Sequence, residues 1–391
     1  MLTENIKKIT IIGLIDNIGG REIEVRNIIK SLSKDFEIKV ISMFLMTEKS
    51  EAIKGLNSNW TNIYKEINKQ YITIKIITFF LKHYHKRKTP SYFLVDNKIS
   101  KRLFDLSVLK NKILKKEIDE TDAILYCGTL SLNALNQMII YCNQTNTPIV
   151  LRTTGKIQNL TKDFKRLIPK VDVTLVHSSN NGLPLIPYKP KKIIKVDQTS
   201  LQEQLLLNLT ISSKEKLVYG YLGRFSAEKG ILELMEIFNT LNDQLIVAGS
   251  GPLSKEVNQL KSDNITILPL ISPDNISDYF KKIDVLIIPS HEEAGPLVGI
   301  EAMAAGKIIL STKVGAMEER LMDTTNDFWF DINKKQSLID QINLLAKITP
   351  ENIVEIRENI RLHYINNYSI KIISNSYIDI FKSVLDLNKC K

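Results

Sequence analysis

Hydrophobic residues in this chain form short runs that alternate with helical patterns of apolar and polar positions. In the first half such runs occur at Ile9–Leu14, Phe36–Phe44, Ala123–Tyr126, Pro148–Leu151 and Val173–Val176. In the second half they occur at Leu217–Leu222, Gln244–Ala248, Ile265–Leu268, Val285–Ile288 and Ile308–Ser311. Short apolar runs separated by amphipathic helical segments are typical of buried parallel strands. The pattern therefore predicts two α/β units, each with a parallel sheet covered by helices on both faces.

A boundary between the two units is expected near Pro187–Gln204, where prolines, lysines and polar residues interrupt both patterns. We therefore expect an N-terminal domain over residues 1–195 and a C-terminal domain over residues 196–367. A chain of 391 residues is long enough for two such domains. Near the end of the chain, the periodicity of Tyr368–Leu385 predicts a long amphipathic helix.

The composition, with 43% apolar and 25% charged residues, is that of a folded globular protein. No uninterrupted apolar run approaches the roughly 20 residues needed to span a bilayer. Residues 1–8 lead into a strand without the layout of a secretory signal, so we expect a cytoplasmic protein. Three cysteines are too few for a disulfide framework or a four-cysteine zinc site.

Charge is distributed unevenly between the two halves. Residues 1–200 contain 33 Lys and Arg against 18 Asp and Glu, a net of +15, whereas residues 201–391 contain 20 against 25, a net of −5. A basic half suits nucleic acid, an anionic bilayer or an anionic acceptor. Few aromatic residues interleave with the basic ones, which argues against nucleic acid. The densest basic segments are 82–88 and 98–116. In the second segment apolar residues recur among the lysines at helical spacing, which predicts a basic amphipathic helix. Such a helix either lies on a membrane or is a solvated surface helix.

Two carboxylates, Glu293 and Glu301, flank a change from loop to helix after the strand Val285–Ile288. Pro296 suits a helix start, the residues up to Ala305 favour helix, and Gly306 suits a left-handed terminator. Helical side chains lean toward the amino terminus, so Glu301 is expected to reach the region that Glu293 lines, where open α/β sheets bind ligands. The alternative is a pair of solvated glutamates.

A second candidate site follows the first strand of the second half, in the loop 223–230. Arg224 and Lys229 lie beside Gly223 near the start of a predicted helix. Two cations at a helix amino terminus make an anion site that favours phosphate. A solvated turn is the alternative for this segment taken alone.

These two segments, in this order, resemble retaining glycosyltransferases of family 4, which have the GT-B fold. The matching elements are Glu-x7-Glu at 293–301 followed by Ala-Met-Ala-x-Gly at 302–306, Gly-Arg-x4-Lys-Gly at 223–230, and Gly-x-Gly-Pro at 249–252. Two positions depart from the family pattern. Gly295 stands where the family has a large apolar residue, and the family's histidine is absent from the stretch 152–156 that follows a predicted strand.

The resemblance implies an α/β GT-B fold in which two Rossmann-like domains with parallel sheets face an interdomain cleft. It implies that residues 1–195 bind the acceptor, that residues 196–367 bind the donor, and that a C-terminal helix at 368–391 packs back on the first domain. It also implies transfer of a sugar, with retention, from a UDP- or GDP-sugar to a saccharide or lipid-linked saccharide acceptor in surface polysaccharide or glycolipid synthesis. The expected location is the cytoplasm, with or without a peripheral contact at the inner membrane face. No Asp-x-Asp occurs, so no metal is expected.

Residue roles follow from the same resemblance. Arg224 and Lys229 would hold the diphosphate, Glu293 the sugar hydroxyls and Glu301 the ribose hydroxyls. The other donor-binding positions that the resemblance implies are Gly223, Gly249, Gly251, Gly295, Leu297 and Val298.

The pair Gly19-Gly20 matches a glycine loop of GT-B amino-terminal domains, with a tight structural turn as the alternative. It does not form a dinucleotide fingerprint, which requires Gly-x-Gly-x-x-Gly. In place of the absent histidine, Thr153 or Thr154 is a candidate hydroxyl, and Arg152 or Lys156 a candidate phosphate contact. A histidine placed as His177 is, after a buried strand, is more often a hydrogen-bonded structural residue than a catalytic one. For His291 the sequence leaves both roles open.

Two other functions remain open from the sequence. The first is a catalytically inert GT-B scaffold that serves as a membrane or nucleic-acid adaptor. The second is a nucleotide-sugar epimerase of the same fold.

Overall fold

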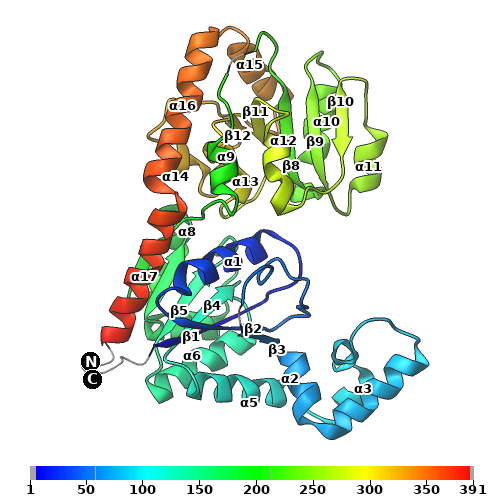
Figure 1. Cartoon of the computed structure of the whole chain (residues 1–391), viewed down its shortest axis with the longest axis vertical. Helices are drawn as coiled ribbons and strands as arrows, with labels where there is room; N and C mark the ends of the chain where they lie inside the picture. Colours follow the sequence, from blue (N-terminus) through cyan, green and yellow to red (C-terminus); the bar gives the residue numbers. More distant parts are fainter. Residues whose placement is uncertain (1–5, 58, 213, 388–391) are drawn as a thin grey trace. The chain divides into compact units, whose positions relative to one another are not determined.

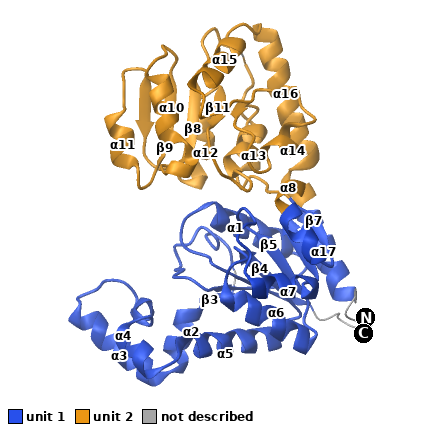
Figure 2. Cartoon of the chain, turned by 180° about the vertical axis from the view of Figure 1, so that it is seen from behind, with its two compact units in different colours: residues 1–176, 182–196, 374–391 blue, residues 177–181, 197–373 orange. Residues whose placement is uncertain are grey.

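The computed structural model describes residues 6–57, 59–212 and 214–387, so the last four residues of the predicted C-terminal helix lie outside the described residues. The chain divides into two compact units (Figure 2). Unit 1 comprises residues 1–176, 182–196 and 374–391, and unit 2 comprises residues 177–181 and 197–373.

Unit 1 is built on a seven-stranded sheet in the order β3-β2-β1-β4-β5-β6-β7, with every neighbouring pair parallel. Most side chains of its inner strands are apolar and buried, which is why these strands appear in the sequence as hydrophobic runs. In β2, Lys39 is an exception and pairs with Glu117. The strands are β1 (Lys8–Gly13), β2 (Glu37–Ser42), β3 (Asn59–Asn62), β4 (Ala123–Gly128), β5 (Ile149–Thr153), β6 (Val173–Val176) and β7 (Ile193–Lys195).

Helices cover both faces of this sheet, with α1 on one side and α5 and α6 on the other (Figure 1). Between β3 and β4, a helical extension leaves the sheet and returns along α5. The helices of this part of the chain are α1 (Gly20–Leu32), α2 (Ile63–Gln70), α3 (Ile72–Tyr84), α4 (Lys98–Leu103), α5 (Leu106–Asp119), α6 (Asn133–Thr145), α7 (Lys162–Leu167) and α8 (Ser179–Gly182), with the 3₁₀ segment η1 at Ser91–Leu94.

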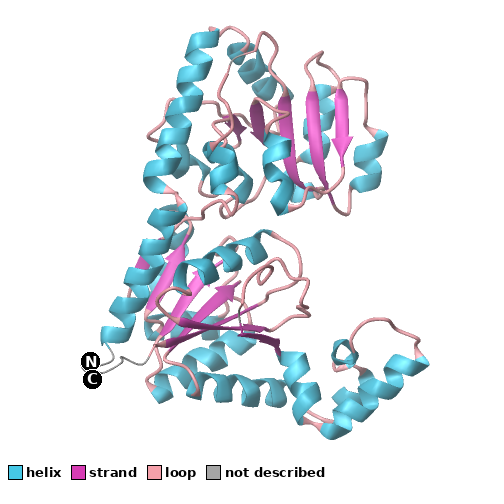
Figure 3. Ribbon diagram, viewed as in Figure 1, coloured by secondary structure: helices cyan, strands magenta, loops and turns pink. Residues whose placement is uncertain are grey.

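Unit 2 has a five-stranded parallel sheet in the order β10-β9-β8-β11-β12 (Figure 3). The strands are β8 (Tyr219–Arg224), β9 (Leu245–Ser250), β10 (Ile265–Leu268), β11 (Val285–Ile288) and β12 (Ile308–Ser311). The helices of unit 2 are α9 (Glu203–Leu207), α10 (Ile231–Phe238), α11 (Ser254–Gln259), α12 (Ile276–Phe280), α13 (Leu297–Ala304), α14 (Met317–Leu321), α15 (Lys335–Leu345) and α16 (Pro350–Asn367). The last helix, α17 (Ile370–Leu387), begins in unit 2 and belongs to unit 1 from residue 374 on.

Alternation along the strands of unit 2 creates two separate cores. Val285 and Ile287 of β11 face a cluster built with α10 and α15, whereas Leu286 and Ile288 face a cluster built with α9, α12, α13 and α16. Each face of the sheet is therefore sealed by helices. The α/β class and the parallel sheets expected from the sequence are confirmed.

The sequence pattern misses the outermost strands of unit 1. β3 has the sequence Asn-Trp-Thr-Asn, and β7 has three residues, none of which is fully buried. An edge strand has one neighbour and is not buried on all sides, so it needs no continuous apolar run. The predicted tail helix corresponds to α17, which begins at Ile370 after a break that separates it from α16.

Across the stretches 6–57, 59–212 and 214–387, no helix combines the length and apolar character needed to cross a bilayer.

Candidate functional site

The carboxyl ends of β8 and β11 in unit 2 lie at the point where the strand order reverses. The order β10-β9-β8-β11-β12 places the first and fourth strands of the sheet side by side. Doubly wound sheets bind ligands at this switch point, outside the carboxyl ends of the strands. The loop after β8 carries Arg224 and Lys229, and the loop after β11 carries Glu293. Both predicted motifs therefore meet at one position in the fold.

The loop after β8 is held against β11 through Gly230, which has φ +64°. A Cβ on Gly230 would lie 2.1 Å from the carbonyl oxygen of Pro289, so a larger residue does not fit there. The amide of His291 donates to the carbonyl of Glu228 at 2.9 Å, which ties the two loops together. Arg224 is exposed at the end of β8, and its guanidinium makes no hydrogen bond or ion pair within the described part of the chain.

Lys229 and Glu293, which are 64 positions apart in sequence, form a direct ion pair. The hydroxyl of Ser290 also donates to the same carboxylate oxygen of Glu293 at 3.3 Å. Both members of the pair are mostly but not completely buried. The arrangement presents a cation and an anion, each able to exchange its partner for a ligand group.

Glu301 is placed differently from Glu293. It lies in α13, which begins after Pro296 and ends at Ala304, and Gly306 follows with φ +59°, so the predicted helix and its left-handed terminator are confirmed. Burial raises the pKa of Glu301 to about 8. Among the described residues its carboxyl group has no hydrogen-bond or ion-pair partner. A buried acidic group without a partner is costly and is typical of a site that a polar ligand completes.

Glycines near this site allow close backbone approach. Gly249 pairs with Gly223 across β8 and β9, and a Cβ on Gly249 would lie 1.9 Å from the Gly223 carbonyl oxygen. A Cβ on Gly251 would lie 2.4 Å from the carbonyl oxygen of Phe225. The predicted glycines are thus required by the backbone at the ends of these strands. At the start of α13, Leu297 and Val298 are partly buried.

The space above Gly295 is filled by two side chains that are distant in the sequence. A Cβ on Gly295 would lie 3.0 Å from Nη2 of Arg320 and 3.1 Å from Cβ and Cγ of His177. Both side chains are buried in unit 2. A large apolar residue at position 295, as the family pattern has, would require these side chains to move. Gly295, where this chain departs from the family pattern, therefore leaves the space that Arg320 and His177 fill.

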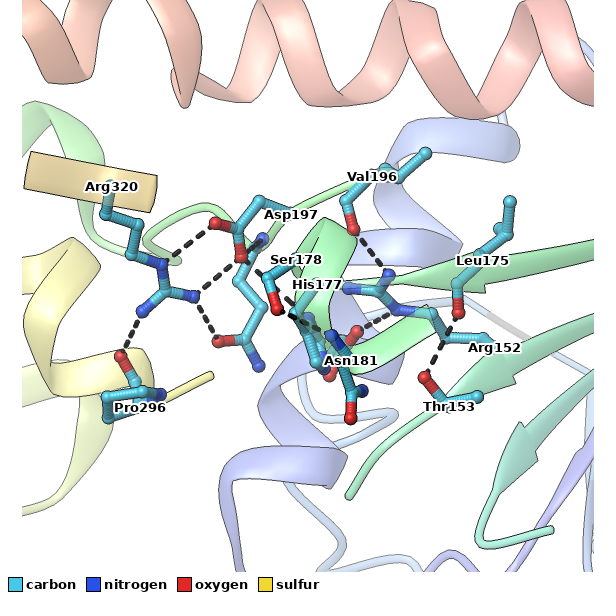
Figure 4. Close-up of polar contacts among 12 residues, drawn as sticks. Arg152, Thr153, Leu175, His177, Ser178, Asn181, Val196, Asp197, Pro296 and Arg320 are labelled. Carbon is cyan, nitrogen blue, oxygen red and sulfur yellow. Dashed lines mark hydrogen bonds and ion pairs between the residues drawn. The ribbon is translucent and has the colours of Figure 1, made fainter. Parts of the chain in front are cut away.

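Arg320 holds the loop 293–296 through a network that Figure 4 shows. Its guanidinium makes a bidentate contact with Asp197 at 2.8 and 2.6 Å and donates to the carbonyl of Pro296 at 2.6 Å and to Gln198 Oε1 at 3.3 Å. It is fully buried. The sequence does not identify Arg320 as a site residue, because no local motif marks it. The one signal was Gly295, whose small size leaves the space that Arg320 fills.

The two histidines considered in the sequence differ in burial, because His177 is buried and His291 is exposed. His177 is buried with Nδ1 3.8 Å from Asp197, in agreement with the structural expectation. His291, in the loop after β11, lies beside Glu233, with 3.2 Å between Nε2 and the carboxylate. Neither pair forms part of the Lys229–Glu293 cluster.

In unit 1, the glycine loop after β1 is occupied by the protein's own groups. α1 begins at Gly20. A Cβ on Gly19 would lie 2.6 Å from Oε2 of Glu22. The other carboxylate oxygen of Glu22, Oε1, accepts a hydrogen bond from the amide of Asp16 at 2.8 Å. Arg21 donates to the carbonyl of Leu14 at 2.6 Å and to the hydroxyl of Thr154 at 3.0 Å. The open side of this loop is Gly20, where a Cβ would meet nothing within 4 Å.

The candidate role of Arg152 as a phosphate contact is wrong. The side chain is fully buried, forms an ion pair with Glu24 of α1 and donates to the carbonyl of Val196 at 2.5 Å (Figure 4). Thr153 is also buried and donates to the carbonyl of Leu175 at 3.2 Å. Of the four residues considered in the stretch 152–156, Arg152 and Thr153 lie in β5, whereas Thr154 is partly exposed and Lys156 is exposed. Within the residues that the structure describes, no group of three or more His, Cys, Asp and Glu side chains is arranged to hold a metal ion.

A family model described as "Glycosyl transferases group 1" matches residues 209–363, which contain all of the donor-side elements above. Similar curated proteins include the lipopolysaccharide 1,2-N-acetylglucosaminetransferase of Salmonella typhimurium, 27% identical over 56% of this chain and 60% of that protein. The capsular polysaccharide biosynthesis glycosyltransferase CapM of Staphylococcus aureus is 26% identical over 55% of this chain and 54% of that protein. This chain therefore spans 60% or less of the length of these relatives.

Solved structures match the fold over nearly the whole chain. A glycosyltransferase from Rickettsia africae has a TM-score of 0.70 and 18% identity, and covers 97% of this chain and 99% of that chain. Anabaena Alr3699/HepE in complex with UDP-glucose has a TM-score of 0.70 and 15% identity, and covers 96% of this chain and 100% of that chain. The two Rossmann-like domains of this chain thus have the fold of GT-B glycosyltransferases.

Proposed function

We propose, from the glycosyl transferases group 1 domain at residues 209–363, that this chain is a retaining glycosyltransferase. It moves a sugar from a nucleotide-sugar donor to a saccharide or lipid-linked saccharide acceptor. The observation that carries the proposal is the meeting of Lys229 and Glu293 at the switch point of the unit 2 sheet, with the buried Glu301 carboxyl unpartnered. The names of the Salmonella and Staphylococcus relatives support a role in surface polysaccharide or glycolipid synthesis.

The reaction breaks the bond between the anomeric carbon and the diphosphate, so negative charge develops on the phosphate oxygens. Arg224 and Lys229 stabilise that charge, and each contact that strengthens in the transition state contributes about 3 kcal/mol. When the diphosphate binds Lys229, Glu293 is released to accept hydrogen bonds from the sugar hydroxyls. Glu293 then positions the donor without becoming a covalent nucleophile.

The nucleoside end of the donor is assigned to Glu301, whose carboxyl accepts hydrogen bonds from the ribose hydroxyls. The bound ribose would give the buried group the partners that it otherwise lacks. Gly223, Gly249 and Gly251 let the backbone approach the nucleotide, and Gly295, Leu297 and Val298 complete the donor loop. The UDP-glucose complex of the Anabaena neighbour supports a UDP-sugar, with a GDP-sugar as the second candidate donor.

Unit 1 is assigned to the acceptor, with Gly20 and Thr154 near the ends of its central strands. In this proposal residues 1–195 form the acceptor-binding domain and residues 196–367 the donor-binding domain. The protein works in the cytoplasm, at the inner membrane face where lipid-linked acceptors are available, and transfer proceeds without a metal ion.

A panel of UDP-, GDP- and ADP-sugars tests the proposal. We expect transfer or slow donor hydrolysis with one nucleotide class, an α-anomeric donor giving an α-linked product by NMR, and no loss of rate in EDTA. Absence of both turnover and nucleotide binding would contradict the proposal. Nucleotide binding without transfer would indicate an inert scaffold, and interconversion of donor sugars would indicate an epimerase.

A further inference from the structure

The segment between Glu66 and Asp96 contains six Lys and Arg and no Asp or Glu. It includes α3 and the connection to η1, in the extension that leaves the seven-stranded sheet of unit 1. In both views α3 lies beyond α2, away from the sheet (Figures 1 and 2). This cationic segment belongs to unit 1 and carries none of the residues assigned to the nucleotide sugar in unit 2, so the proposed reaction does not explain its charge.

α3 has an apolar face on each side. One face carries the buried Ile74 and Thr78 and packs on α2 and η1, where the Thr78 hydroxyl donates to Asn68 at 2.7 Å. The opposite face carries large apolar side chains that are between 51% and 82% exposed. These side chains are Ile72, Ile76, Phe79, Phe80 and Tyr84.

The exposed side chains form one continuous stripe. At about 100° per residue, positions 72, 76, 79, 80 and 84 fall within an arc of about 140° on the helix surface. Phe79 contacts both Phe80 and His83, with ring centroids 5.8 and 4.2 Å apart. A soluble surface rarely presents such a row of aromatic and aliphatic side chains unless it binds something.

The predicted basic amphipathic segment 98–116 behaves differently from α3. In α5 the apolar residues Leu106, Ile113 and Leu114 are buried in the unit 1 core, and Leu109 packs against that core. This segment is therefore a surface helix whose apolar face covers its own domain. Three apolar residues of the segment 98–116 are exposed: Ile99 and Leu103 in α4, which are one turn apart, and Val108 in α5. α4 packs against α3.

Cations flank the stripe. Lys75 and Lys82 lie on one side of it at helical spacing, and Lys86, Arg87 and Lys88 follow directly after α3 and are exposed. Lys101 and Arg102 lie in α4 next to it. Among these residues Lys101 pairs with Asp96. Lys82 is partly buried, and the other cations named here are exposed beside the apolar surface.

We propose that the exposed face of α3 lies in the interface of an anionic lipid bilayer. The apolar stripe inserts at the level of the headgroups, where aromatic rings are favoured, and the cations contact the anionic headgroups. A protein partner would need acidic groups around an apolar groove that fits this stripe. A bilayer supplies both features without a specific shape. This inference does not depend on the proposed reaction, because it requires neither donor nor acceptor.

The test is co-sedimentation of the full-length protein with vesicles of phosphatidylcholine alone and of phosphatidylcholine with phosphatidylglycerol. We expect binding to the anionic vesicles, and a loss of about tenfold or more in affinity for Phe79→Glu/Phe80→Glu. The matched control is Leu344→Glu/Leu362→Glu, which changes two residues of unit 2 that are 47% and 56% exposed. The control is expected to bind as the wild type does.

A second pair of variants tests the charge component. Lys86→Ala/Arg87→Ala/Lys88→Ala is expected to weaken binding about tenfold or more at low salt, and added salt should abolish the difference. Lys255→Ala/Lys261→Ala/Lys347→Ala removes the same charge from exposed positions of unit 2 and serves as control. Circular dichroism establishes that each variant is folded.

The proposal would be overturned if the wild-type protein did not bind anionic vesicles, or if the Phe79→Glu/Phe80→Glu variant bound them equally well. It would also be overturned if the wild type formed a dimer, the variant were a monomer and neither bound vesicles. A fourth contrary outcome is binding of single-stranded RNA through α3 with no binding to vesicles. Nucleotide binding is measured on the same variants, because it reports on the proposed reaction and not on α3. Variants that still bind nucleotide show that a failure of the membrane proposal is separate from a failure of the proposed reaction.

Discussion

The strand ends of the two units differ in what their charged side chains do. In unit 2, Lys229 and Glu293 meet in a partly exposed pair, Arg224 faces solvent and the Glu301 carboxyl has no partner among the described residues. In unit 1, the arginine at the end of β5 is fully buried against Glu24. Similar topology therefore does not imply similar use of the same positions. Charges that retain the ability to change partners mark a binding site, whereas charges that are fully paired mark a structural contact.

The largest expected effect tests the structural side of this comparison. Arg152→Met leaves Glu24 buried without its cation, so we expect a loss of about 3–5 kcal/mol in the free energy of unfolding, measured by urea denaturation. The double variant Arg152→Met/Glu24→Leu should recover most of the lost free energy of unfolding, because both buried charges are then removed. Lys382→Ala, which breaks an exposed pair with Asp35, is the control and should cost less than about 1 kcal/mol. An Arg152→Met variant of unchanged stability would contradict the structural assignment.

The next effect tests the functional side. Lys229→Ala removes the cation assigned to the donor diphosphate, so we expect turnover to fall by about 10²-fold or more in a transfer assay. Lys112→Ala in α5 removes an exposed cation of unit 1 and should leave turnover unchanged. If Lys229→Ala kept the full rate, the phosphate role and the contrast between the two units would both be wrong.

A smaller effect is expected at Arg320, which acts on the donor through the Glu293–Pro296 loop. Arg320→Lys keeps the positive charge but loses the planar guanidinium group, which donates hydrogen bonds to Asp197 and to the carbonyl of Pro296 at the same time. We expect kcat/KM for the donor to fall about tenfold, mainly through a higher donor KM, with the acceptor KM unchanged. Arg357→Lys is the matched control: this buried arginine donates to the carbonyls of Gly306 and Ser212. It should lower stability without changing the donor KM, and equal donor KM values in both variants would argue against a positioning role.

The smallest expected effect is the pH dependence of stability in the nucleotide-free protein. Burial raises the pKa of Glu301 to about 8, above the ordinary value of 4.5, so the folded state binds more protons than the unfolded state between these values. Its contribution to stability is fully present below pH 4.5 and is lost as the pH rises through 8. Glu301→Gln removes this dependence. We expect the variant to gain about 2–4 °C in thermal midpoint relative to wild type between pH 6 and pH 9, measured by scanning fluorimetry.

A parallel pH response in the two proteins would show that Glu301 does not titrate in this range. Saturation with the donor nucleotide provides an internal check. A ribose bound at Glu301 favours the carboxylate, so nucleotide should reduce the difference between wild type and variant.

The sequence by itself determined the α/β class, the central strands of both sheets and the order of the donor-side motifs. These features are local: a strand buried on both faces needs a continuous apolar run, and a phosphate loop needs its cations and glycines at fixed spacing. The β8 and β11 loops could be paired because parallel strands end at the same edge of a sheet.

Tertiary structure alone decided which charged groups are free to act. Arg152 and Arg224 both lie at the carboxyl ends of strands, yet the first is paired with Glu24 of α1 and the second is exposed. The same holds for Arg320 above Gly295 and for the two faces of α3, where apolar periodicity does not reveal which face is covered. Burial and pairing depend on residues that are distant in the chain, and no local pattern records those contacts.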